Sequence, residues 1–226
     1  MKKCFSIVIS DYEISDIALP NTVSSYLEYF DEYTIWDKHM IKDFLKNNFD
    51  INILNAYNVL NGNAYKADLA SYCILNKLGG WYSAITNEIV QSPPDTGDKD
   101  MVIFRDIQKN SNTSWAVACQ LIYSKPNNKV LDIAINSILE NINNKHYGNT
   151  SLCITGPCVL GRSIAIAGDE VNYMIGDFVE RDSKAFYLDD KKFVNYKKYE
   201  GGVTNISGTN NYNDFWNNKN VYKEKE

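Results

Sequence analysis

A helix pattern that ends in two glycines, within residues 64–90, constrains the fold of this chain most strongly. Across residues 64–78, apolar side chains recur at the three- and four-residue spacing of an α-helix, and Asp68 lies near one face of that helix. Gly79-Gly80 predicts where the helix ends, because glycine accepts the left-handed backbone of a C-terminal cap. The chain must then turn sharply into whatever follows.

A strand pattern follows the two glycines. Residues 81–86 place Tyr82, Ala84 and Thr86 on one side of an extended chain. The helix and the strand are joined by a short turn, so the side chain of Asp68 and the face that carries Ala84 are expected to border one cleft. Ligands of open α/β sheets bind in such clefts, at the carboxyl ends of strands.

The remaining patterns alternate strand and helix, which is typical of a layered α/β fold. We expect a single Rossmann-like domain over residues 1–226, with a mostly parallel sheet flanked by helices and an irregular segment over roughly residues 196–226. The expected strands are residues 4–10, 33–36, 81–86, 101–104 and 116–123, with a strand and turn over 151–160. The expected helices are residues 21–30, a helix after Asp37, 64–78 and 129–142.

Composition excludes several classes of function. The net charge of −5 argues against nucleic acid as a partner, because a phosphate backbone attracts a basic face. The five cysteines include no CxxC pair, and Cys153 and Cys158 stand five positions apart without a ligand cluster, so we expect neither a disulfide scaffold nor a zinc site. A reducing cytosol fits this cysteine usage, and no apolar run is long enough to cross a bilayer.

The central stretch resembles the hallmark of the family 32 glycosyltransferases, which include many bacterial capsule and lipooligosaccharide enzymes. The large clostridial glucosylating toxins carry a similar arrangement. The matching positions here are Lys66-Ala67-Asp68-Leu69, Tyr72, Gly79-Gly80, Trp81 and Tyr82. Weaker matches are Ile35-Trp36-Asp37, Thr155-Gly156-Pro157 with Leu160-Gly161, and Phe215-Trp216 with Val221-Tyr222.

This resemblance implies a GT-A fold and the transfer of a hexose or N-acetylhexosamine, with retention, from a UDP-linked sugar to a bacterial surface glycan. The acceptor would be an oligosaccharide or a lipid-linked glycan, and the location cytoplasmic or at the inner face of the cytoplasmic membrane. Residues 196–226 would close over the donor. The donor-binding positions that it implies are Trp36, Lys66, Asp68, Ser71, Tyr82, Ala84, Thr155, Gly156 and Trp216.

The sequence departs from the family at the acidic motif. The family's Asp-x-Asp falls on Ala84-Ile85-Thr86, and its arginine falls on Ser71. In the family these acids hold the donor sugar and a divalent cation, Mn²⁺ or Mg²⁺, which neutralises the diphosphate. Our hypothesis is that Ala84, at the catalytic position beside Asp68, replaces an aspartate as an inactivating substitution. The remaining candidate metal ligands are Thr86, Asn87 and Asp214.

Three alternatives stay open at this point. A relative without catalysis could bind sugar nucleotides or glycans, which would suit the missing acids. A toxin-like enzyme could glycosylate a host protein. A third class is an interaction subunit of a polysaccharide assembly complex.

Overall fold

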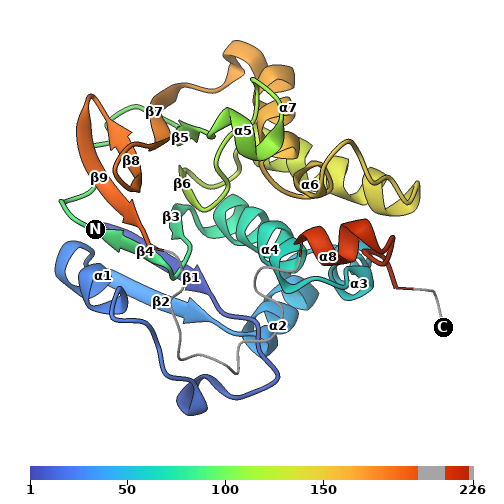
Figure 1. Ribbon diagram of the computed structural model, residues 1–226. Helices are drawn as coiled ribbons and strands as arrows, with labels where there is room; N and C mark the ends of the chain where they lie inside the picture. The colour runs from blue at the N-terminus through green and yellow to red at the C-terminus, as the bar shows by residue number, and fades with distance from the viewer. Residues whose placement is uncertain (198–211, 224–226) are drawn as a thin grey trace.

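The strands form one continuous sheet in the order β2-β1-β3-β6-β5-β7-β8-β9-β4, in a computed structural model that describes residues 1–197 and 212–223 (Figure 1). The strands are β1 (Lys3–Ile7), β2 (Glu32–Trp36), β3 (Gly80–Ser83), β4 (Asn87–Ile89), β5 (Met101–Arg105), β6 (Leu121–Ser124), β7 (Tyr173–Glu180), β8 (Lys184–Leu188) and β9 (Lys191–Tyr196). The α/β class expected from the sequence is confirmed.

Helices lie between and beside these strands (Figure 1). The α-helices are α1 (Val23–Tyr29), α2 (Lys38–Asn48), α3 (Ile51–Val59), α4 (Asn63–Leu78), α5 (Gln108–Ser111), α6 (Lys129–Asn143), α7 (Pro157–Ala167) and α8 (Tyr212–Asn217). Short 3-10 turns cover η1 (Ile14–Asp16), η2 (Ser151–Cys153) and η3 (Gly168–Glu170). Within the described residues, no helix is long and apolar enough to cross a membrane.

Strand side chains alternate between two cores, as the period of two in a strand requires. Phe5 and Tyr82 face a large core shared with α2, α3, α4, α6 and α7. Their neighbours Cys4 and Trp81 face a second core, which α1 shares with β7, β8 and β9. The sheet curls over this second core, so that Phe193 of β9 packs with its ring centroid 5.3 Å from that of Trp81.

The sheet is mixed, which corrects the expectation of a mostly parallel one. Three strand pairs are parallel, β1–β2, β1–β3 and β5–β7. Five pairs are antiparallel, because β6 runs against both β3 and β5, and the meander β7-β8-β9 continues to β4. The sequence patterns did not predict β7, β8 and β9.

Two other expectations need correction. Residues 151–160 contain no strand; η2 is followed by α7, which begins at Pro157, because a proline at the first helical position fixes the backbone that a helix needs. The tail is not irregular throughout, since α8 is helical and Tyr222 forms a β-bridge with Leu60. Residues 198–211 and 224–226, which belong to the expected closing segment, lie outside the described residues.

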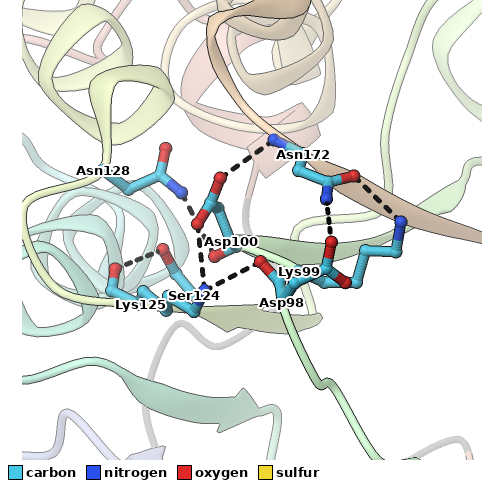
Figure 2. Close-up of polar contacts among 7 residues, drawn as sticks. All are labelled: Asp98, Lys99, Asp100, Ser124, Lys125, Asn128 and Asn172. Carbon is cyan, nitrogen blue, oxygen red and sulfur yellow. Dashed lines mark hydrogen bonds and ion pairs between the residues drawn. The ribbon is translucent and has the colours of Figure 1, made fainter.

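A network of polar contacts lies at the amino-terminal end of β5 (Figure 2). Asp100, just before β5, accepts hydrogen bonds from the main-chain nitrogen of Asn172 at 3.0 Å and from Lys125 Nζ at 3.1 Å. The Asn172 bond, and then Lys125, lower the pKa of Asp100. Asn172 also donates to Asp98 and accepts from Lys99. These contacts fix the starts of β5 and β7 relative to the end of β6.

At the diglycine turn between α4 and β3, the backbone conformation and the neighbouring atoms leave little room for a residue larger than glycine at position 79. Its φ is +66°, and an added Cβ would lie 2.8 Å from Pro126 Cδ and 3.1 Å from the carbonyl oxygen of Ser124. Gly80 has a φ of +97° and would meet the carbonyl oxygen of Lys3 at 3.1 Å. Only glycine therefore fits where α4 must turn into β3.

Gly79→Ala is expected to lower the free energy of unfolding by about 2 kcal/mol or more, because a left-handed alanine costs about 1–2 kcal/mol and the contact with Pro126 adds to that. Gly97→Ala is the matched control, since Gly97 also has a positive φ but no atom within 4 Å of the added Cβ. Urea denaturation of both variants measures the difference. Equal losses would show that the packing at Pro126 contributes nothing.

Candidate functional site

A cleft of about 390 Å³ opens where β1 and β3 end and α4 begins. Residues after β5 and before β6 border the same cleft, because β6 is antiparallel and its amino end meets the carboxyl ends of its neighbours. The polar residues along its wall are Asn63, Asp68, Tyr82, Thr86, Asp106, Asn110, Gln120, Lys184 and Tyr196. The sequence-based expectation of a cleft shared by α4 and β3 is thus met by a cavity that both Asp68 and Ala84 line.

Asp68 lies in the wall of the cleft with its carboxylate held at both oxygens. Thr155 Oγ1 donates to Oδ2 at 2.8 Å, and Cys119 Sγ donates to Oδ1 at 3.4 Å. The side chain is buried, with 5% of its surface exposed, and Thr155 is fully buried behind it. Fixed in this way, the carboxylate can accept hydrogen bonds from a ligand without first losing side-chain entropy.

Residues 84–86, which the sequence pattern predicted as part of a strand, form a turn after β3 ends at Ser83; we call this the motif turn. The main-chain nitrogen of Ala84 donates to the carbonyl oxygen of Gln120, and its carbonyl oxygen accepts from Tyr26 OH, both at 2.8 Å. Ala84 and Thr86 are partly exposed and line the cleft. The backbone here is held rigidly, and the side chain at position 84 is a methyl group where the resemblance placed a carboxylate.

Two charged groups of the cleft were missed by the sequence analysis. Asp106 follows the buried strand β5, and burial raises the pKa of its carboxyl, while the main-chain nitrogen of Ile107 donates to Oδ1 at 2.8 Å. Lys184, at the start of β8, is the one basic residue among those that line the cleft in the described structure. A polar residue directly after a buried strand was a usable signal for Asp106. Nothing in the sequence pattern indicated Lys184.

Some of the residues predicted to bind the donor do not line the cleft but lie next to residues that do. Thr155 holds Asp68, and Gly156 is the N-cap of α7, next to Pro157, which does line the cleft. Ser71 is fully buried and donates to the main-chain oxygen of Asp68, so its hydroxyl is satisfied within α4. Tyr82 lines the cleft and packs on Phe5 with ring centroids 5.3 Å apart.

Trp36 and Lys66 are not among the residues that line the cleft, and each adjoins one that is: the main-chain oxygen of Trp36 accepts from Val8, and Lys66 precedes Ala67. Trp36 packs edge-on against Phe44, with ring centroids 5.1 Å apart, at the end of β2. Lys66 lies over the ring of Tyr57, at 5.5 Å from its centroid. Burial, followed by repulsion from Lys223 and Lys42, lowers the pKa of Lys66 to about 8.

Trp216 and Asp214 belong to α8, which is also absent from the cleft lining. Trp216 Nε1 donates to the carbonyl oxygen of Tyr147 at 2.8 Å, and Lys219 Nζ lies 4.5 Å from the centroid of the Trp216 ring. Asp214 is exposed. In this arrangement α8 is anchored to the segment after α6.

The described part of the cleft does not fit a divalent cation. A hard cation takes several oxygen ligands, usually with carboxylates among them. Asn87 is buried, and its amide oxygen has no hydrogen-bond partner among the described residues, but it does not line the cleft. Asp214 lies on α8, so Thr86 is the one of the three candidate ligands that lines the described cleft. Among residues 1–197 and 212–223, no group of three or more His, Cys, Asp or Glu side chains could hold a metal.

Comparison with known proteins points to the class of protein. Residues 17–103 match the family described as "Glycosyltransferase sugar-binding region containing DXD motif". The match includes α4, the diglycine turn and β3, and thus both Asp68 and Ala84. It supports a glycosyltransferase with a nucleotide-sugar donor; the resemblance places the two acids of the motif on Ala84 and Thr86, neither of which is acidic.

The fold is similar to one solved structure in particular, "PaToxG Glycosyltransferase", with a TM-score of 0.55. The two sequences are 16% identical, and the likeness covers 73% of this chain and 69% of that chain. At this identity the likeness establishes the glycosyltransferase fold alone. No curated protein matches the sequence of this chain.

Proposed function

We propose that the chain is a glycosyltransferase that moves a hexose or N-acetylhexosamine from a UDP-linked sugar to an oligosaccharide or lipid-linked glycan, with retention. The observation that carries this proposal is the cleft that both Asp68 and the motif turn line, because these two features lie within the segment that matches a sugar-binding region. A lipid-linked acceptor would place the enzyme at the inner face of the cytoplasmic membrane. The finer assignment to family 32 is part of the same proposal.

The carboxylate of Asp68 is suited to bind the donor. Thr155 and Cys119 orient it, so it can accept hydrogen bonds from sugar or ribose hydroxyls in a fixed position. Positioning of this kind accounts for much of the catalysis in group transfer, because the reacting atoms must be held close together and correctly oriented.

Lys184 supplies positive charge to the cleft, a role that the resemblance gives to a cation held by the motif acids. It lines the cleft and forms no ion pair within 4.0 Å among the described residues. The ammonium group can therefore donate to diphosphate oxygens and stabilise the charge of the leaving nucleoside diphosphate. The metal-assisted mechanism implied by the resemblance does not fit the described residues, so no step is assigned to a metal.

Asp106 is suited to the acceptor side of the reaction. Its raised pKa makes the carboxylate a stronger base, which can accept a proton from an acceptor hydroxyl. Because the base form is the active one, turnover should rise with pH through this raised pKa.

A second candidate function is binding of nucleotide sugars without turnover. The observation that favours it is the pair of side chains at the motif positions, Ala84 and Thr86, neither of which is acidic. The wall of the cleft, with Asp68 and Lys184, would serve a binding protein equally well.

Thermal-shift titration with UDP, GDP and their sugars, with and without manganese, tests the proposal. We expect UDP-sugars to raise Tm in the presence of EDTA, and Lys184→Met to weaken their affinity about tenfold, as expected for one charge-assisted hydrogen bond. Lys191→Met, at an exposed position of β9, is the matched control and should bind normally.

The other outcomes separate the alternatives. A flat response to all donors would favour an interaction subunit of a polysaccharide assembly complex. Binding without hydrolysis or transfer would favour the binding protein. The role given to Lys184 would be overturned if UDP-sugars bind only with manganese and Lys184→Met leaves their affinity unchanged.

A further inference from the structure

Two cysteines face each other on the segment that supports Asp68. Cys153 ends η2, Cys158 lies in the first turn of α7, and their Sγ atoms are 3.1 Å apart. Cys153 is half-buried and Cys158 is 7% exposed. The other cysteines, at positions 4, 73 and 119, are all buried. A small reagent from solvent can therefore reach Cys153 first.

The surroundings of Cys153 favour its thiolate. The hydrogen bond between Cys153 and Cys158, together with Thr150, whose Oγ1 lies 3.4 Å away, lowers the pKa of Cys153 to about 5. Burial raises the pKa of Cys73 and of Cys119 well above the ordinary value. The thiolate is the nucleophilic form of cysteine, so these groups should differ widely in reactivity at neutral pH.

We propose that Cys153 and Cys158 form a reversible thiol–disulfide site, a modification site that reacts with low-molecular-weight disulfides such as glutathione disulfide. The Cys153 thiolate attacks one sulfur of the reagent, forms a mixed disulfide and releases one glutathione thiolate. The Cys158 thiol then loses its proton and attacks Cys153 Sγ, which forms the intramolecular disulfide and releases the second glutathione. Overall, one glutathione disulfide is reduced to two glutathione molecules while the two cysteines are oxidised.

The two sulfurs are already close to bonding distance. A disulfide has an S–S length near 2.05 Å, so the two sulfurs need to approach by roughly 1 Å. The closed bond would span Thr155, which holds Asp68, and would join segments that contribute Leu152 and Pro157 to the cleft. The site stands on the contact between the two sulfurs and does not depend on the proposed glycosyltransferase activity.

The test uses the full-length, fully reduced chain, incubated with glutathione disulfide at pH 7 and analysed by mass spectrometry. Trypsin releases residues 146–162 as one peptide that contains both cysteines and no other. We expect the mass of this peptide to fall by two hydrogens on oxidation, and treatment with dithiothreitol to restore the original mass. In Cys158→Ser, which keeps a hydrogen-bond donor, Cys153 should instead retain a glutathione adduct. In Cys153→Ser, Cys158 should stay unmodified.

A second test uses no substitutions, so its result does not depend on whether a variant folds. In the native wild-type chain, brief alkylation with iodoacetamide should label Cys153 at least roughly tenfold faster than Cys73 or Cys119. Equal labelling rates, or oxidation that joins other cysteines or two chains before residues 146–162 change, would overturn the proposal.

Discussion

Asp68→Asn is expected to weaken the binding of UDP-sugars roughly 10- to 100-fold, the effect of losing a hydrogen bond to a charged acceptor. The amide keeps the shape of the side chain but turns an NH₂ group toward one of the two donors, Thr155 or Cys119. One oxygen then remains to accept a hydrogen bond, where the carboxylate offered two. Isothermal titration calorimetry of the reduced chain measures the loss directly.

The stability of the same variant must be followed, because Asp68 is buried and its two donors would no longer both be satisfied. Asp214→Asn is the matched control, since Asp214 is exposed on α8 and outside the cleft lining. If Asp68→Asn folds, melts near the wild-type temperature and binds UDP-sugars as well as the control does, Asp68 has no part in donor binding.

Ala84→Asp is expected to raise sugar-nucleotide hydrolysis about tenfold or more and to make it depend on manganese. Position 84 lies at the cleft wall and is partly exposed, so a carboxylate there remains solvated. The backbone of the turn is held by Gln120 and Tyr26, so the substitution should leave its geometry intact. A carboxylate at this point supplies a ligand that a hard cation lacks in the present chain, and a bound cation stabilises the leaving diphosphate.

Ala84→Asn separates charge from size, because asparagine has nearly the same volume without the negative charge. We expect no manganese-dependent gain from it. Release of UDP from UDP-sugars, measured with and without manganese, gives the comparison. If Ala84→Asp gains nothing over the wild-type chain, or gains no more than Ala84→Asn, the hypothesis that Ala84 replaces a functional aspartate is wrong.

The parts of the fold that the sequence predicted are those with strong local signals. The helix over residues 64–78, the diglycine turn and the strand after it follow from side-chain period and from the backbone freedom of glycine, which act over a few residues. Asp37 likewise caps α2, accepting hydrogen bonds from the main-chain nitrogens of His39 and Met40. In each case the sequence carries its own reason for the local structure.

The secondary-structure predictions were wrong in segments where the local sequence signals for helix, strand and turn conflict or are weak. Residues 151–160 contain β-favouring side chains, yet Gly156 and Pro157 start a helix there. The β8–β9 hairpin turns at Asp189 and Asp190, both with positive φ, a conformation that aspartate tolerates better than most residues. That signal is weaker than an Asn-Gly pair, and the hairpin was missed.

From the sequence, only the part of the candidate site that α4 and the residues around β3 form could be predicted. Asp68 and Ala84 were placed together because α4 and β3 adjoin in the chain. Asp106 and Lys184 reach the same cleft through the order of the strands in the sheet, which local patterns do not determine. Trp36, Lys66 and Trp216 were proposed by resemblance alone and lie outside the lining residues.

The curled sheet has a consequence for any attempt to produce residues 17–103, the segment that matches the family, as a separate fragment. β3 pairs with β1 on one edge and with β6 on the other, and β4 pairs with β9, so each strand that flanks the motif turn takes a partner from beyond residue 103. Lys197 adds a main-chain hydrogen bond to Thr86 and an ion pair to Glu88. A fragment that stops at residue 103 would leave the β6 edge of β3 and the β9 edge of β4 unpaired, so a usable fragment must extend at least through Lys197.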